Sequence, residues 1–211
     1  MVAYHSYLLY SGSNVDADII STNVWYSWGG ATVGKARFIR QILQSYGVDN
    51  KSLSNDESGL LYYSGTPGDS FYQAQADHLV RSYTRALAEN ISILFWYTLE
   101  GPGWRYSGLL NNVSPNPSFI AYQQLIQRLK NTRYIGTVSY NPGIEAYSFD
   151  NRQQRVHVVW TKTDQNINLT IPGVKFIAAY GRDGNPITPI ASGQDYQLSV
   201  GFSPIYIVLV P

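Results

Sequence analysis

Two hydrophobic periods divide the 211-residue chain. Up to about residue 132, strand-like runs alternate with segments whose apolar residues recur every three or four positions, the period of a helix that packs on one face. From about Tyr134 onward, apolar and polar residues alternate with a period of two, the period of strands that bury one face. The pattern therefore predicts an α/β region over residues 1–132 and an all-β region over residues 133–211.

Strands and helices alternate in the first region. The expected strands are Val2–Tyr10, Lys51–Glu57 and Ile91–Leu99, the last a continuous apolar run typical of a strand buried on both faces. The expected helices are Val33–Tyr46, Asp69–Asn90 and a third that opens at Asn116-Pro117. This alternation predicts parallel strands joined by right-handed crossovers. Three such strands would leave open edges, which indicates either an unusual small sheet or the tail of a larger one.

Short strands separated by turn signals fill the second region. The turns are expected at Asn141-Pro142-Gly143, Pro172-Gly173 and Asp183-Gly184. Such spacing predicts an antiparallel β-sandwich of roughly eight strands.

Composition and charge exclude several classes of function. Fifteen basic and 14 acidic residues give a net charge of +1, and no basic run stands out, so neither nucleic acid nor an anionic membrane is an expected partner. Apolar stretches are too short to cross a bilayer, and no signal peptide is recognisable at the start of the chain. No cysteine is present, the three histidines lack the spacing of metal ligands, and position 106 breaks a dinucleotide fingerprint that would start at Gly101. We therefore expect no metal and no cofactor.

Two glutamates follow expected strands of the α/β region, where parallel architectures carry their active sites. Glu57 closes Lys51–Glu57, and Glu100 follows the third strand. The strand that leads to Glu57 is unusually polar, which favours a site over a solvated loop acid, the alternative interpretation. His5 and Tyr7 belong to a strand that is expected to end at the same rim.

Tryptophans gather beside the same predicted rim. The sequence places Trp25, Trp28, Trp96 and Trp104 in or next to these loops. Aromatic faces suit sugar rings, and a chain with 14% aromatic but only 14% charged residues, against roughly 25% charged on average, suits neutral hydroxyl-rich ligands. For Trp96, which stands in an apolar run, a position in the core is the alternative.

With these residues in view, the chain resembles the last part of a clan A glycoside hydrolase. The resemblance rests on the order and spacing of ATVGKARFIRQILQSYGV, LSNDESGLL, QADHLVRSYTRAL, ISILFWYTLEGPGWRYSGLL and NPSFIAYQQL. Those enzymes are (β/α)₈ barrels that cleave glycosidic bonds with retention. The resemblance implies that the three strands are barrel strands six, seven and eight, and that residues 133–211 form the accompanying C-terminal β-sandwich.

The resemblance also implies roles for individual residues. Glu57 matches the nucleophile of strand seven, and Tyr7, in the His5-x-Tyr7 segment, is similar to residues that orient that carboxylate. Trp96 matches the tryptophan that forms the floor under the sugar. Trp104 and Arg105 extend the implied site for an oligosaccharide, polysaccharide or glycoside substrate. His5 and Trp28 are further expected substrate contacts because of their place at the predicted rim.

The chain departs from the family at the acid/base glutamate, which follows an asparagine on strand four and has no match here. Asn55-Asp56-Glu57 does not replace it, because adjacent residues on one strand cannot flank a bond from two sides. We therefore expect a C-terminal fragment with little or no activity by itself, whose partner is a missing N-terminal barrel segment or a further copy of the chain. The alternatives are a non-catalytic carbohydrate-binding protein and a subunit that completes a barrel with another chain.

Overall fold

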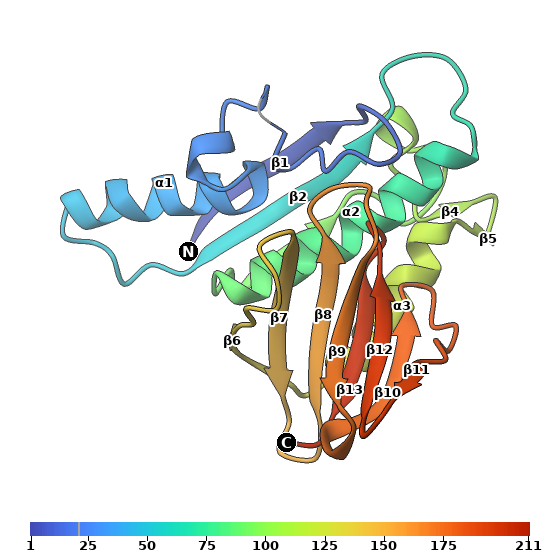
Figure 1. Ribbon diagram of the computed structural model, residues 1–211. Helices are drawn as coiled ribbons and strands as arrows, with labels where there is room; N and C mark the ends of the chain where they lie inside the picture. Colours follow the sequence, from blue (N-terminus) through green and yellow to red (C-terminus); the bar gives the residue numbers. More distant parts are fainter. Residues whose placement is uncertain (21) are drawn as a thin grey trace. The chain divides into compact units, whose positions relative to one another are not determined.

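The computed structural model describes residues 1–20 and 22–211, and it divides the chain into two compact units, Met1–Phe119 and Ile120–Pro211 (Figure 1). The division falls inside helix α3 (Pro117–Leu129), which begins at a proline, the residue whose fixed φ suits a first helical turn. Each unit has a hydrophobic core of its own.

A parallel sheet with strand order β1-β2-β3 is the centre of the first unit. Its strands are β1 (Val2–Leu9), β2 (Leu53–Leu61) and β3 (Ile93–Trp96). Helix α1 (Ala31–Ser45) connects β1 to β2, and helix α2 (Asp69–Ala88) connects β2 to β3, so the expected alternation is confirmed. The smaller elements are the 3₁₀ turns η1 (Tyr26–Trp28) and η2 (Trp104–Tyr106) and the short pair β4 (Leu110–Asn111) and β5 (Ser114–Pro115).

Both helices pack on the same face of this sheet. Tyr4 of β1, Leu53 of β2 and Leu94 of β3 lie in one apolar cluster with Ala36 of α1 and Ala86 of α2. A second cluster, nearer the ends of the strands, joins Leu8, Leu60 and Trp96 to Phe71 and Ala74 of α2. We call this side of the sheet the helix face and the opposite side the open face.

The second strand is longer than the sequence pattern indicates. We predict a strand that ends at Glu57 and leaves through Ser58-Gly59, but β2 continues to Leu61. Leu60 and Leu61 are both buried, and this burial favours continued pairing with β1. Glu57 therefore lies within the strand and not at its end.

The third strand is shorter than predicted and is not buried on both faces. β3 ends at Trp96, and Phe95 is 57% exposed. β3 is an edge strand, and the helices cover only the face on which Leu94 lies. The apolar run Ile91–Leu99 thus combines one covered face with an open face that carries Phe95 and, just after the strand, Tyr97.

Eight antiparallel strands form two sheets in the second unit, with orders β10-β13-β8-β7-β6 and β11-β12-β9. The strands are β6 (Arg133–Thr137), β7 (Ile144–Asp150), β8 (Arg155–Thr161), β9 (Ile167–Pro172), β10 (Phe176–Gly181), β11 (Ile190–Ser192), β12 (Asp195–Val200) and β13 (Ile205–Leu209), with the turn η3 (Gly173–Lys175) between β9 and β10. Inward residues of both sheets, among them Val159, Ile207, Leu169 and Leu198, share one core. The alternation with period two is therefore confirmed as a sandwich.

Candidate active site

A β-bulge on β2 determines where Glu57 points. Against β1, Tyr4 pairs with Asn55 but His5 pairs with Glu57, so Asp56 is an extra residue. The register against β3 shifts in the same stretch. Residues seven apart face opposite sides of a regular strand, yet Leu53 and Leu60 both pack on the helix face. The bulge therefore reverses the alternation and turns Glu57 to the open face, which is how bulges re-aim side chains beside active sites.

Buried polar side chains hold the bulge in place. With its amide oxygen toward the Ser6 hydroxyl, fully buried Asn55 donates from its nitrogen to the backbone oxygens of Tyr4 (3.1 Å) and Glu57 (2.9 Å). The Ser58 hydroxyl donates to the Phe95 carbonyl at 2.8 Å, which ties the other side of the bulge to β3. This explains why the strand is polar where a purely structural strand would be apolar.

Glu57 is the centre of a small cluster on the open face. The Tyr7 hydroxyl donates a hydrogen bond to Oε2 of Glu57 at 2.7 Å. Nδ1 of His5 lies 3.5 Å from the same oxygen, and its Nε2 lies 3.5 Å from Oδ1 of Asp56, so one imidazole approaches both carboxylates. The Glu57 side chain is 40% exposed and thus accessible to a ligand. We refer to His5, Tyr7, Asp56 and Glu57 as the Glu57 cluster.

Tyr7 is a hydrogen-bond donor that keeps its proton. Burial raises the pKa of its hydroxyl, and the hydrogen bond to the Glu57 carboxylate and that group's negative charge raise it further. A hydroxyl that stays protonated at neutral pH fixes one oxygen of the carboxylate and leaves the other free to react.

Two further predicted residues stand beside the cluster. The ring of Trp104 meets the ring of Tyr7 edge-on, with centroids 5.0 Å apart and planes perpendicular. The Arg105 guanidinium lies 5.5 Å from the centre of the Trp104 ring. His5 and Tyr7 thus lie against Glu57 itself, and the Tyr7 ring connects them to Trp104 and Arg105.

Trp28 and Trp96 are not brought to this cluster. Trp28 packs against Phe38 of α1, with ring centroids 5.7 Å apart. Trp96 points to the helix face, where its ring packs in the cluster of Leu60 and Phe71 and its indole N–H donates to the Ser107 carbonyl at 2.8 Å. Trp96 is therefore partly buried on the side of the sheet opposite to Glu57.

Sequence reasoning missed two members of the site. Asp56 lies beside His5 only because of the bulge, and the pattern of apolar and polar residues gives no sign of a bulge. Tyr97 follows Trp96 and has the opposite orientation, so its ring lies on the open face, 6.3 Å from that of Tyr7. Strand alternation applied to Trp96 and its neighbour would have found Tyr97.

The loop after β1 is held by buried charges. Arg85 of α2 pairs with Asp16 at 2.7 Å and with Asp18 at 3.3 Å, and all three side chains are almost completely buried. Asp18 also accepts the backbone N–H of Thr32 at 2.8 Å, in the first turn of α1. Gly30, at φ 100°, allows this approach, because a Cβ there would lie 2.7 Å from the Asp18 carbonyl oxygen. The network fixes the loop to both helices.

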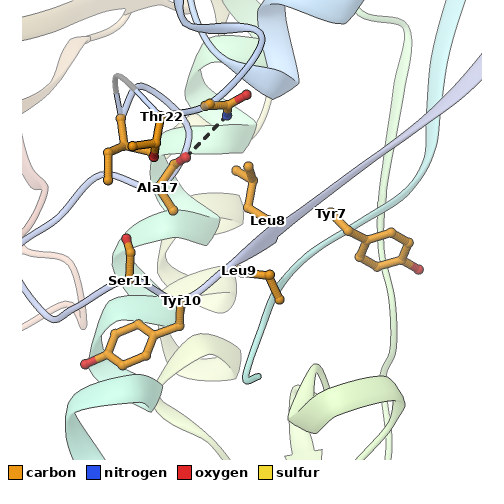
Figure 2. Close-up of a pocket in the computed structure, with 9 residues that line it drawn as sticks. Tyr7, Leu8, Leu9, Tyr10, Ser11, Ala17 and Thr22 are labelled. Atoms are coloured by element: carbon orange, nitrogen blue, oxygen red, sulfur yellow. Dashed lines mark hydrogen bonds between the residues drawn. The ribbon is translucent and has the colours of Figure 1, made fainter. Parts of the chain in front are cut away.

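A pocket of about 370 Å³ lies between this loop and the end of β1 (Figure 2). It is lined by Tyr7, Leu8, Leu9, Tyr10, Ser11, Ala17, Ile20, Thr22 and Asn23. The ring of Tyr7 points away from Ala17 and Thr22 in this view (Figure 2). The pocket therefore borders the Glu57 cluster but does not contain Glu57.

The cluster offers one exposed carboxylate and a second one beside it on the same strand. Hydrolysis with retention needs two carboxyl groups about 5–5.5 Å apart on opposite sides of the bond. Asp56 approaches the same imidazole as Glu57, and Glu100 accepts a hydrogen bond from the Val113 N–H at 3.2 Å in the turn between β4 and β5. The two carboxylates of the cluster, Asp56 and Glu57, thus lie beside each other on one strand.

Two kinds of feature are absent from residues 1–20 and 22–211. No helix there has the length and apolar character that a membrane span requires. No group of three or more His, Cys, Asp or Glu side chains in that part of the chain is arranged to hold a metal ion.

The chain is similar to solved structures, although comparison of its sequence with known families and proteins finds no match. No protein-family model and no curated protein sequence matches the chain. A family 39 glycoside hydrolase from Bacteroides cellulosilyticus WH2 aligns with 99% of this chain at a TM-score of 0.73 and 18% identity, over 44% of its own length. An α-L-arabinofuranosidase from Thermotoga maritima aligns with 99% of the chain (TM-score 0.59, 12% identity), over 52% of its length.

A third solved structure also aligns with most of this chain over about half of its own length. The catalytic domain of the family 30 xylanase C from Talaromyces cellulolyticus aligns with 87% of the chain (TM-score 0.56, 12% identity), over 50% of its own length. The chain thus spans about half the length of these structures. Its fold is similar to that of part of these three glycoside hydrolase structures, which agrees with the resemblance that the sequence carries.

Proposed function

We propose that the chain is the C-terminal part of a retaining glycosidase in which Glu57 is the nucleophile. In this proposal, β1, β2 and β3 are barrel strands six, seven and eight, residues 1–132 are the remnant of the catalytic domain, and residues 133–211 are an accessory sandwich. The observation that carries the proposal is the bulge at Asp56, which turns Glu57 to the open face and against the Tyr7 hydroxyl.

The geometry supports a two-step displacement. Ionised Glu57 attacks the anomeric carbon of the sugar with its free oxygen, while Tyr7 holds the other oxygen, and a glycosyl ester forms as the bond to the leaving oxygen breaks. Water then attacks the same carbon and loses a proton to solvent, and the ester bond breaks to release Glu57 as a carboxylate. Trp104 and Tyr97 offer aromatic faces beside the reacting centre for the sugar ring.

In this proposal, the acid that protonates the leaving oxygen comes from a part of the barrel outside these 211 residues. Two observations support this step: the chain aligns with about half of the length of each structural neighbour, and Asp56 lies beside Glu57 on the same strand. General acid catalysis contributes about 10²–10⁴-fold. We therefore expect that substrates whose leaving group needs a proton are hydrolysed very slowly by this chain.

The substrate class in this proposal is a glycoside, and two neighbours guide the choice of sugar. One is described as a xylanase and another as an arabinofuranosidase, so pentosides belong in the first panel together with glucosides.

Glycosides with a dinitrophenyl leaving group test the proposal, because this leaving group departs without protonation. We expect slow release of dinitrophenolate by the unmodified chain from at least one glycoside of the panel, and no release from the methyl glycoside of the same sugar. Glu57→Gln should abolish the release. Glu100→Gln, which removes an exposed glutamate of the same unit outside the cluster, should leave it unchanged. Equal release by the unmodified chain and by Glu57→Gln would contradict the proposal.

A further inference from the structure

Asp56 has a place in the Glu57 cluster that the proposed displacement does not use. Its side chain is 40% exposed, but its Oδ1 atom is buried and accepts no hydrogen bond from the described residues. Nε2 of His5 lies 3.5 Å from this atom, which is too far for a good hydrogen bond but within the distance of an ion pair. A buried carboxylate oxygen without a donor is costly, so its position beside a reactive carboxylate points to a role other than stability of the fold.

The Asp56 carboxylate does not hold the bulge in which it lies. The neighbouring residues Asn55 and Ser58 make the hydrogen bonds that fix the backbone there, and none of these bonds involves the Asp56 side chain. A second negative charge next to Glu57 also repels the charge of Glu57. The contact that offsets this repulsion is the one between Asp56 and His5.

The ring of His5 lies between the two carboxylates in one of two possible orientations. In this orientation, Nδ1 lies 3.5 Å from Oε2 of Glu57 and Nε2 lies 3.5 Å from Oδ1 of Asp56. Half a turn about the Cβ–Cγ bond would put carbon atoms of the ring opposite both carboxylates. Lys35 fixes the backbone of His5 and not its half-exposed ring, since Nζ of Lys35 donates to the His5 carbonyl at 2.7 Å. The Asp56 carboxylate therefore favours the orientation in which Nδ1 faces Glu57.

Oε2 of Glu57 is the oxygen that needs a donor in the second step of the proposed reaction. The Tyr7 hydroxyl and Nδ1 of His5 both approach Oε2, so the other oxygen forms the ester bond to the sugar. In the second step, water attacks the anomeric carbon and gives a proton to solvent, and the ester bond breaks. Its electron pair becomes carboxylate charge that is shared with Oε2. A donor held at Oε2 stabilises this developing charge, and such contacts are often long before the substrate binds.

We propose that Asp56 is a positioning residue that holds the His5 imidazole against Oε2 of Glu57 and thereby accelerates hydrolysis of the glycosyl ester. This inference rests on the proposed function, since it requires that Glu57 forms the ester. Asp56 acts only through His5. A carboxylate that bound the sugar directly, or one that only supported the strand, would instead affect formation of the ester.

A dinitrophenyl glycoside with fluorine at C2 measures the two steps separately, because its glycosyl ester is long-lived. Intact-mass spectrometry follows the gain of the fluoroglycosyl group, which is the first step, and its loss after removal of the reagent, which is the second. We expect Asp56→Ala to slow the loss about tenfold, the effect of one hydrogen bond to a charged group, and to leave the rate of the gain nearly unchanged.

Asp56→Asn is the conservative variant. It keeps the shape of the side chain and an acceptor oxygen but removes the charge, so it should slow the loss by a smaller factor, about threefold. This variant also decides the question if Asp56→Ala does not fold.

A double-mutant cycle tests whether Asp56 acts through His5. His5→Gln should slow the loss of the ester by a factor similar to that of Asp56→Ala, and Asp56→Ala should have no further effect in the His5→Gln chain, whereas independent contributions would multiply. Asp49→Ala is the matched control, because Asp49 is an exposed aspartate that precedes β2 and lies outside the Glu57 cluster. It should leave both rates unchanged.

Three results would overturn the inference. The first is an unchanged loss of the ester in both Asp56 variants, the second is a gain that slows as much as the loss, and the third is a full effect of Asp56→Ala in the His5→Gln chain. A chain that gains no fluoroglycosyl group contradicts the proposed function and this inference with it. A chain that is labelled at Glu57 but gives one of the three results contradicts this inference alone.

Discussion

At the scale of single residues, the hydrogen bond from Tyr7 to Glu57 determines how the Glu57 carboxylate is oriented. A carboxylate that is 40% exposed would rotate freely without a partner, and the Tyr7 hydroxyl at 2.7 Å removes that freedom. Burial and the neighbouring carboxylate raise the pKa of Tyr7, so the donor is present throughout the range in which Glu57 would react.

Tyr7→Phe should slow the reaction of Glu57 and leave the fold intact. The substitution removes one hydrogen bond to a charged group and keeps the ring that packs on Trp104, so we expect release of dinitrophenolate to fall about tenfold or more. Initial rates with a dinitrophenyl glycoside measure the effect. Tyr46→Phe, at an exposed tyrosine that follows α1, is the control and should keep the original rate. An unchanged rate in Tyr7→Phe would show that the hydroxyl does not orient Glu57.

At the scale of elements, the loop between β1 and α1 depends on the buried pairs around Arg85. Burial by itself would raise the pKa of Asp16, but the guanidinium charges of Arg85 and Arg81 outweigh it and hold the pKa well below the usual range. Asp18 also pairs with Arg85, and its carboxylate accepts the backbone N–H of Thr32 in the first turn of α1. The positions of the loop, α1 and α2 therefore depend on the same set of buried contacts.

Arg85→Ala should destabilise the first unit, because it leaves two buried aspartates without their closest cation. Removal of one partner from a buried ion pair typically costs about 3–5 kcal/mol. Urea unfolding followed by tryptophan fluorescence measures the loss, since four of the five tryptophans belong to this unit. Arg40→Ala, which removes a half-exposed cation 3.7 Å from Glu89, is the control and should cost less than about 1 kcal/mol. A similarly small loss in Arg85→Ala would mean that the loop does not depend on this network.

Periodicity predicted most elements but not the local geometry that makes the site. The helices α1, α2 and α3 and the paired strands of the sandwich follow from the periods of three to four and of two. The bulge within Leu53–Leu61 cannot be predicted in this way. It reverses the alternation of the strand, and the polar contacts of Asn55 that hold it produce no repeating pattern in the sequence. For the same reason the sequence placed Glu57 at the end of a strand that in fact continues to Leu61.

At the scale of the whole chain, each unit buries a histidine in its neutral form. In the first unit, burial lowers the pKa of His78 to about 4, against the opposing charge of Asp16. In the second unit, burial lowers the pKa of His157 to about 4, and the Tyr140 hydroxyl lies 2.6 Å from its Nδ1. Neither histidine belongs to the Glu57 cluster.

Both units should lose stability in mild acid. A histidine takes up a proton near pH 6.5 when unfolded but only near pH 4 when folded, so the unfolded state binds more protons between these values. The free energy of unfolding should be constant above about pH 7 and fall as the pH drops toward 4, by up to about 3 kcal/mol for each histidine.

Thermal unfolding at several pH values measures this loss of stability. His78→Gln and His157→Gln should each make the dependence less steep. A stability that stays constant from pH 7 to 4 would contradict the assignment.

Covalent trapping tests the central claim, that Glu57 attacks an anomeric carbon, most directly. A dinitrophenyl glycoside with fluorine in place of the C2 hydroxyl forms the glycosyl ester but hydrolyses it slowly, and its leaving group needs no acid. Mass spectrometry of the treated chain should find one fluoroglycosyl group on the peptide that contains Glu57, and none in Glu57→Gln. A label on another carboxylate, such as Glu100, or an unlabelled chain with the sugar that it hydrolyses, would contradict the account.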